Sequence, residues 1–284
     1  MLKPAMVTNW LGSRSLLPEV YVIIDDIMTK REDTNPQGSS YRGFVGWYEK
    51  RLRRYKRPVL ASTLILVYLL IACLLGVAVA PSFYAVSELF KWSETFNGLA
   101  PFYIKGVSIV LGFLIFGFSS IFIIPIPNRL ILRFLKPYRG PYYSINVIWW
   151  YLHNILTYSV RYTFLEWITP TPFNLFFYQW MGMKIGSRVE VNSTNISDPG
   201  LITLEDGVTI GGSATIIAHY AVQGYLIIDP VVIRKDATIG LRAIIMGGVE
   251  VGEGAKVLPN SVVLPKTIIP AGETWAGVPA KKVL

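Results

Sequence analysis

One of the two histidines in this chain of 284 residues stands where a repeat is interrupted. Residues 216–229 read IIAHYAVQGYLIID, inside a region that otherwise repeats every six residues. The histidine in this stretch is His219. A neutral imidazole has a pKa close to physiological pH, so it can accept a proton from a hydroxyl or an amine. The pattern indicates His219 as a candidate general base at a corner where the chain leaves the repeat. The alternative is a histidine that only hydrogen-bonds the backbone of a loop.

The repeat begins at Ile185, and fourteen hexads can be written along the chain from there. Most hexads open on an aliphatic residue, and a small residue often follows four positions later, as at Val189, Ala214, Ala237, Ala255 and Ser261. A fixed period of this kind predicts a solenoid with three short flat sides and an aliphatic core. We expect residues 222–226 to form a five-residue insertion, after which the repeat resumes at Ile227.

The hexads IGSRVE, IGGSAT, IGLRAI and VGEGAK and the ending WAGVPAKK resemble the hexapeptide-repeat acyltransferase family. The resemblance covers residues 184–284 and implies a left-handed parallel β-helix, a homotrimer, and acetyl-CoA or another acyl-CoA as donor in the groove between neighbouring solenoids. It also implies that a histidine from a loop-bearing corner acts as the base. The aromatic segment before the repeat, with GMKIG, resembles a narrower group, the membrane-bound hexapeptide domains at the end of some non-ribosomal peptide synthetases.

Further site residues follow from this resemblance. The ending GVPAKK resembles the family's terminal motif, in which basic side chains approach the phosphates of CoA, and flexible glycines allow close approach to the pantetheine arm. The donor-binding candidates are Gly247, Gly248, Gly277, Lys281, Lys282 and Arg242. The two lysines could instead form a solvated basic tail. TNISDP departs from the hexad rule, and its Asn195 and Asp198 either bind the acceptor, orient His219 or form a plain turn.

Composition points to a membrane. Hydrophobic residues make up 52% of the chain and charged residues 16%. Residues 59–80 and 106–127 are uncharged stretches of 22 residues, long enough to cross a hydrocarbon core of about 30 Å. The basic run KRLRRYKR (residues 50–57) precedes the first stretch, and four basic residues follow the second. The positive-inside bias therefore predicts a cell-membrane protein with both termini and the β-helix in the cytoplasm. This role, which is compatible with anionic lipid, explains the basic run better than nucleic-acid binding does.

We therefore expect a membrane protein of mixed α and all-β structure. A cytoplasmic segment (1–58) precedes two transmembrane helices (59–127), aromatic helices (128–183) and the left-handed β-helix (184–284). The aromatic region is interpreted as two interfacial helices split at TPTP (residues 169–172); the alternative is a buried helical hairpin packed on the soluble domain. His153 is expected on a helix face without a role as a ligand, since no metal-binding companion is nearby.

The predicted function is acyl transfer from acyl-CoA to the oxygen or nitrogen of a lipid-linked or amphiphilic acceptor, with no metal. A γ-type carbonic anhydrase shares the solenoid but needs three histidines for its zinc, and only two occur here. A non-catalytic trimeric scaffold in a membrane complex remains open.

Overall fold

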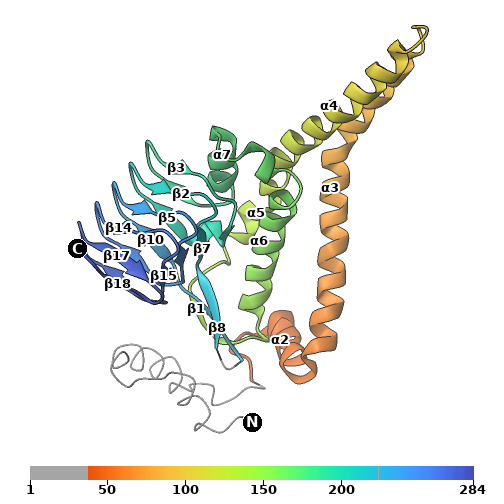
Figure 1. Cartoon of the computed structure of the whole chain (residues 1–284). Helices are drawn as coiled ribbons and strands as arrows, with labels where there is room; N and C mark the ends of the chain where they lie inside the picture. The colour runs from red at the N-terminus through yellow and green to blue at the C-terminus, as the bar shows by residue number, and fades with distance from the viewer. Residues whose placement is uncertain (1–37, 223) are drawn as a thin grey trace, which may run out of the picture.

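The structure is a computed structural model that describes residues 38–222 and 224–284; most of the predicted N-terminal segment (1–58) lies outside this range. A helical module comes first in the chain, and a β-solenoid follows it from residue 184 onward (Figure 1). The coils stack away from the helices, so that the C-terminus lies at the far end of the solenoid.

Three parallel sheets form the sides of the solenoid. The first contains β2 (Lys184–Ile185), β5 (Ile202–Leu204), β10 (Val231–Ile233), β13 (Glu250–Val251) and β16 (Ile268–Ile269). The second contains β3 (Glu190–Val191), β6 (Thr209–Ile210), β11 (Thr238–Ile239), β14 (Lys256–Val257) and β17 (Thr274–Gly277), on which β18 (Ala280–Lys282) pairs in the antiparallel sense. The third contains β4 (Ile196–Ser197), β7 (Thr215–Ile217), β12 (Ile244–Ile245) and β15 (Val262–Val263).

The hexad rule sets both register and core. Ile233 pairs with Val251, and Val251 with Ile269, so each turn of the regular part takes eighteen residues. All three side chains are at most 1% exposed. The predicted small positions (Val189, Ala214, Ala237, Ala255 and Ser261) are buried as well, which confirms that they point inward. Burying each aliphatic side chain contributes about 1.5–3 kcal/mol, and stacking makes the core continuous.

The interruption of the repeat is longer than predicted. Strand β8 (His219–Val222) pairs antiparallel with β9 (Tyr225–Ile228) to form a hairpin, and Ile227 lies inside it opposite Tyr220. The expectation that the repeat resumes at Ile227 is therefore wrong, because the first residue after the hairpin that pairs within the solenoid is Val231, opposite Ile202. The physical reason is that the hairpin has a partner outside the solenoid: β1 (Tyr138–Pro141) of the helical module pairs with β9.

The two apolar stretches belong to a helical hairpin. Helix α3 (Arg57–Ser93) runs antiparallel to α4 (Ala100–Ile123), and a hydrogen bond of 2.6 Å joins the Ser82 hydroxyl to the Gly112 carbonyl (Figure 1). The helix then breaks at the prolines, and α5 (Pro125–Ile131) continues. In their most apolar windows, α3 is 17% buried and the α4–α5 segment is 33% buried. Most of this apolar surface is thus not covered by the described part of the chain.

Helices α6 (Ile145–Arg161) and α7 (Pro172–Trp180) lie between this hairpin and the first coil, with the short helix η2 (Leu165–Ile168) between them. Leu156 of α6 and Phe177 of α7 belong to the same hydrophobic cluster as Val191 and Ile196 of the first coil. Parts of α6 and α7 thus pack on the solenoid, while Trp167 is 74% exposed and Phe173 46%; the interfacial placement of these helices stays a prediction. On its other side α7 contacts α4, where the rings of Phe118 and Phe173 meet edge to face at 5.0 Å.

The contact between α4 and the end of α6 leads to a stability prediction. A Cβ on Gly117 would lie 2.1 Å from the ring of Phe164, which is fully buried. Gly117→Ala should therefore destabilise the protein by about 1–3 kcal/mol through overpacking. The matched control is Gly106→Ala in the same helix, where a Cβ meets nothing within 4 Å. Thermal unfolding in detergent should show a lower Tm for the first variant only; equal Tm values would contradict the packing.

Candidate active site

Among the described residues, His219 and Asp198 form a pair that is suited to proton transfer. The Nδ1 atom of His219 lies 2.6 Å from Oδ2 of Asp198. The carboxylate is fully buried, whereas 21% of the imidazole side chain is exposed. Because a carboxylate can only accept, Nδ1 carries the proton and Nε2 is left with a free lone pair. The arrangement provides an oriented imidazole that can accept a proton from a bound molecule.

The buried carboxylate is held by groups from both parts of the protein. Trp150 and Asn154 of α6 donate to Oδ1 at 2.7 and 2.6 Å, and the backbone N–H of Ala218 donates to Oδ2 at 3.0 Å. Asn154 also accepts from the backbone N–H of Asp198 at 3.3 Å. Asp198 has a positive φ of 62°, which Asp tolerates better than most residues. The irregular TNISDP stretch thus turns this side chain toward α6 and His219.

Electrostatics keep the carboxylate charged. Burial alone would raise the pKa of Asp198, but the hydrogen bond and charge of His219, the amide of Asn154 and the nearby His153 lower it, and the pKa is below its ordinary value. An ionised carboxylate stabilises an imidazolium that forms during proton transfer. The indole of Trp150 meets the ring of His219 edge to face, with centroids 4.7 Å apart, and forms one wall beside the imidazole.

Helix α6 positions these groups by simple periodicity. Its N-terminus is capped by the Ser144 hydroxyl, which accepts from the N–H of Asn146. Trp150, Asn154 and Tyr158 then follow at intervals of four residues and lie on one face. Tyr158 hydrogen-bonds the hydroxyl of Ser197 at 2.7 Å. Sequence reasoning missed these positioning residues, although polar and aromatic side chains at this spacing were a signal that could have pointed to them.

Asn195, the other residue of this stretch that was predicted at the catalytic site, makes its side-chain hydrogen bonds to groups other than His219. Its side-chain oxygen accepts from Arg161, and its amide donates to the carbonyl of Ser213 at 3.4 Å. It therefore helps to fix α6 on the first coil. Of the two candidate residues in this stretch, Asp198 is hydrogen-bonded to His219 and Asn195 is not.

His153 is a buried structural residue. Its side chain is fully buried, its Nδ1 lies 2.8 Å from the Asn128 side-chain oxygen, and its Nε2 accepts from the N–H of Gly200 at 3.3 Å. Burial lowers its pKa to about 4 against a smaller opposite effect of Asp198. His153 thus lies on a helix, as expected, and its two ring nitrogens connect α6 to Asn128 of α5 and to Gly200 of the solenoid.

The donor-side candidates are spread along the solenoid. Gly247 lies next to the His219–Asp198 dyad, because a Cβ on this glycine would be 3.2 Å from the backbone nitrogen of His219. Gly248, with φ of 79°, has its N–H bonded to the carbonyl of Asp229. Arg242 occupies a corner with φ of 55°. These positions lie on the coil that follows the hairpin.

The last candidates lie at the far end. The N–H of Gly277 donates to the Ser261 hydroxyl at 3.2 Å, and Lys281 and Lys282 are exposed on β18. Lys282 forms an ion pair of 2.8 Å with Glu273, whereas no ion pair of Lys281 occurs within residues 38–222 and 224–284. The strand β17 beside them lies three coils from His219, or about 14 Å at a strand spacing of about 4.8 Å.

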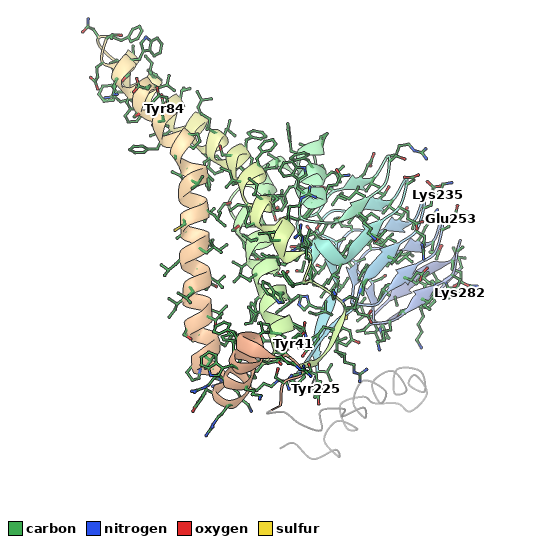
Figure 2. The ribbon with its side chains drawn as sticks, turned by 180° about the vertical axis from the view of Figure 1, so that it is seen from behind. Tyr41, Tyr84, Tyr225, Lys235, Glu253 and Lys282 are labelled. Carbon is green, nitrogen blue, oxygen red and sulfur yellow. The ribbon has the colours of Figure 1, made fainter. Side chains whose placement is uncertain are left out.

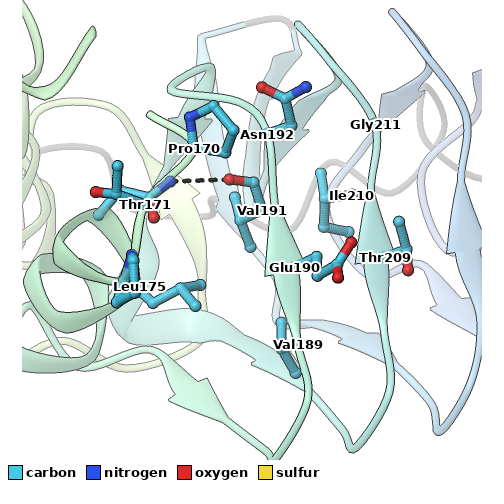
Figure 3. Close-up of a pocket in the computed structure, with 12 residues that line it drawn as sticks. Pro170, Thr171, Leu175, Val189, Glu190, Val191, Asn192, Thr209, Ile210 and Gly211 are labelled. Atoms are coloured by element: carbon cyan, nitrogen blue, oxygen red, sulfur yellow. Dashed lines mark hydrogen bonds between the residues drawn. The ribbon is translucent and has the colours of Figure 1, made fainter. Parts of the chain in front are cut away.

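A cavity of about 490 Å³ lies elsewhere, between the start of α7 and the second sheet (Figure 3). Thr171, Leu175, Glu190 and Ile210 are among its lining residues, and the dashed line in Figure 3 is the bond from Asn174 to the Val191 carbonyl. None of the dyad residues lines it. Across the part of the chain that the structure describes, no group of three or more His, Cys, Asp or Glu side chains could hold a metal ion.

Comparison with known proteins places the chain in a class of repeat proteins. No family model matches it. It is 28% identical over 157 residues to a delta-poly-L-ornithine synthetase of Acinetobacter baumannii, which covers 55% of this chain and 12% of that protein. Over 94 residues it is 39% identical to the mitochondrial gamma carbonic anhydrase 2 of Arabidopsis thaliana (33% and 30% covered), and over 55 residues 44% identical to a 2,3,4,5-tetrahydropyridine-2,6-dicarboxylate N-acetyltransferase of Staphylococcus aureus (19% and 22%).

Among solved structures, a hexapeptide-repeat acetyltransferase of Vibrio cholerae complexed with acetyl coenzyme A matches with 29% identity and a TM-score of 0.34, covering 36% of this chain and 60% of that one. The repeat and its relatives identify the chain as a hexapeptide-repeat protein. Its relatives include an acetyltransferase, and its repeat is similar to that of the hexapeptide-repeat acyltransferase family. The chain spans less than a third of the length of each of the three relatives named above.

The buried imidazole of His153 predicts a pH dependence of stability. In the folded protein it stays neutral down to a pH of about 4, whereas in the unfolded chain it takes up a proton below about pH 6.5. The unfolded state then binds more protons within this window, so the free energy of unfolding should fall as the pH is lowered from about 6.5 to about 4. Urea unfolding at several pH values should show a weaker decline for His153→Gln. An identical decline in both proteins would contradict this assignment.

Proposed function

We propose that the protein is a membrane-anchored acyltransferase that uses acetyl-CoA or another acyl-CoA, with His219 as general base. The observation that carries the proposal is the hydrogen bond from His219 to the fully buried Asp198, which leaves Nε2 available. The base takes the proton of an acceptor hydroxyl or amine while its oxygen or nitrogen attacks the thioester carbonyl. The carbon–sulfur bond then breaks, and the proton passes to the CoA thiolate.

We place the donor along the coils between His219 and β18. Gly247 lies close to the backbone of His219, since a Cβ added to it would be 3.2 Å from the His219 nitrogen, so an extended donor can begin close to the base. Its phosphates would then reach the end where Lys281 is exposed. This arrangement is supported by relatives named as acetyltransferases and by the acetyl coenzyme A bound to the Vibrio cholerae protein. The family's homotrimer, with the groove between neighbouring left-handed solenoids, completes this proposal.

Membrane anchoring is supported by the exposure of α3 and α4. A core helix of a soluble protein buries its apolar surface within the chain, but the most apolar window of α3 is only 17% buried. Exposed apolar surface of this extent needs lipid or a partner. We infer that both helices cross the cell membrane, with the solenoid on the cytoplasmic side, where acyl-CoA is available. The acceptor is then a lipid-linked or amphiphilic molecule.

Two other functions are less consistent with these observations. A gamma carbonic anhydrase is among the relatives, but three-histidine zinc ligation needs more histidines in the solenoid than His219 alone, and His153 is fully buried with both ring nitrogens hydrogen-bonded. A silent scaffold has no need of a charged carboxylate buried beneath an imidazole, since such burial costs stability unless every oxygen is satisfied. The dyad therefore favours catalysis over scaffolding.

Replacing the base tests the mechanism. His219→Asn retains a donor to Asp198 but cannot accept the proton, so acyl transfer should fall by about 10²- to 10⁴-fold with little change in the KM of the donor. The measurement is transfer of a labelled acyl group from acyl-CoA into a membrane-lipid extract, with Tm and CoA binding as checks of folding. Wild-type transfer by this variant would rule out the proposed base.

The two terminal lysines should differ in their effect on the donor. Lys281→Ala removes an unpaired cation and should raise the KM for acyl-CoA about fivefold, which corresponds to about 1 kcal/mol, with kcat preserved. Lys282→Ala is the matched control, because Glu273 already offsets its charge. Saturation kinetics with acyl-CoA as the varied substrate distinguish the two variants. Equal KM values for Lys281→Ala and wild type would rule out the proposed contact between Lys281 and the phosphates of CoA.

A further inference from the structure

The outer face of helix α2 (Gly43–Tyr55) combines aromatic and basic side chains, and within residues 38–222 and 224–284 the one ion pair of this helix is that of Arg53 with Glu49. Phe44 is 76% exposed, Trp47 53% and Tyr55 45%. The exposed basic residues of this helix and of the turn that follows it are Lys50, Arg51, Arg54, Lys56 and Arg57. The acyl-transfer site does not account for this surface, which lies on the other side of α2 from α6.

No exposed acidic residue balances these charges between residues 43 and 57. Glu49 is the single acidic residue of the segment, and it is 1% exposed. It points inward, where its Oε1 accepts from the N–H of Ile145 at 3.2 Å and lies 3.5 Å from Arg53. Every exposed charged side chain of α2 is therefore basic.

The aromatic rings organise the guanidinium groups. Arg51 lies over the ring of Trp47 at 5.4 Å and over that of Tyr55 at 5.9 Å, and Arg54 lies over Tyr55 at 5.5 Å. Phe44 stacks on Trp47 with centroids 5.6 Å apart. Aromatic bodies with polar edges and arginines with apolar stems suit the headgroup layer of a bilayer, where apolar and charged groups meet.

We propose that α2 is a docking surface for the headgroups of an anionic lipid bilayer. Its position fits this partner, because the apolar stretch of α3 begins only two residues after the last of these cations. The charge is complementary to phosphate-bearing lipid, and the aromatic side chains can insert beside it. The proposal rests on the membrane placement of α3 and not on acyl transfer.

Docking of α2 would also fix the position of the bilayer surface relative to the His219–Asp198 dyad. Glu49 bonds the first turn of α6, and the hydroxyl of Tyr41 lies 3.3 Å from the Asn146 side chain. Trp150 follows Ile145 by five residues, or about 8 Å along the helix. Figure 2 shows Tyr41 and Tyr225, at the tip of the β8–β9 hairpin, at one end of the molecule, and Lys235 and Lys282 on the far part of the solenoid.

The test uses the full-length protein in nanodiscs of phosphatidylcholine that contain spin-labelled phosphatidylglycerol or spin-labelled phosphatidylcholine. Electron spin resonance measures how strongly each lipid is enriched next to the protein. The wild type should prefer phosphatidylglycerol at least twofold, and a preference that weakens with salt is expected. The triple variant Lys50→Gln, Arg51→Gln, Arg54→Gln should bring the ratio close to one.

The control has the same loss of charge on the solenoid: Lys184→Gln, Lys235→Gln, Lys256→Gln, all at exposed positions. It should keep the wild-type preference. An unchanged ratio in the α2 variant would overturn the proposal, and so would a ratio that falls equally in both variants. Failure of the wild type to enter nanodiscs would overturn both this proposal and the membrane anchoring, whereas lost acyl transfer alone would touch neither. Salt-sensitive RNA binding that depends on the three α2 cations, together with a lipid ratio near one in the wild type, would assign the surface to nucleic acid instead.

Discussion

A carboxylate without access to water sets the strictest requirement in this structure. Ionised Asp198 is fully buried, and such a charge is tolerated only when its oxygens are satisfied by donors. One oxygen receives its two bonds from α6, through Trp150 and Asn154, and the other receives its bonds from the solenoid, through Ala218 and His219. Neither part of the protein could keep this charge buried alone. The helical module is for this reason a component of the candidate site.

The same requirement explains why the chain leaves its repeat where it does. In a regular coil the corner after β7 would turn directly into the next sheet, and the residue following Ala218 would have no reason to face α6. The hairpin instead runs outward along the helical module, where Leu226 and Ile228 pack against Val147 and Trp150. His219 is paired with Ile228 across the hairpin and so shares its environment beside Trp150. The position of His219 beside Trp150 therefore depends on the hairpin and on the packing of its apolar side chains against α6.

The sequence correctly predicted those parts of the fold that depend on local periodicity. The hexads predicted the parallel coils and the inward small residues, because each position repeats one environment. The predicted length of the insertion was wrong because Ile227 and Ile228 look like the opening of a hexad, although both lie in the hairpin and Ile228 packs in a different hydrophobic cluster. Trp150 and Asn154 were missed because they lie 48 and 44 residues from Asp198, and no local pattern reports a contact over that distance. Asp198 itself was recognised only as one of two candidates, with Asn195, in an irregular stretch.

The position of the dyad at the seam between two modules has a consequence for substrate access. Trp150 closes one side of the imidazole, and the backbone of Gly247 lies close on the side of the later coils. In the proposed arrangement, a donor that extends along those coils toward β18 would leave the side of the helical module for the acceptor. That side is bounded by α6 and by the β1–β9–β8 sheet, and both run from the dyad toward the end where α2 lies. An acceptor held at a bilayer surface beside α2 would therefore reach His219 along the seam, without having to cross the solenoid or displace the donor.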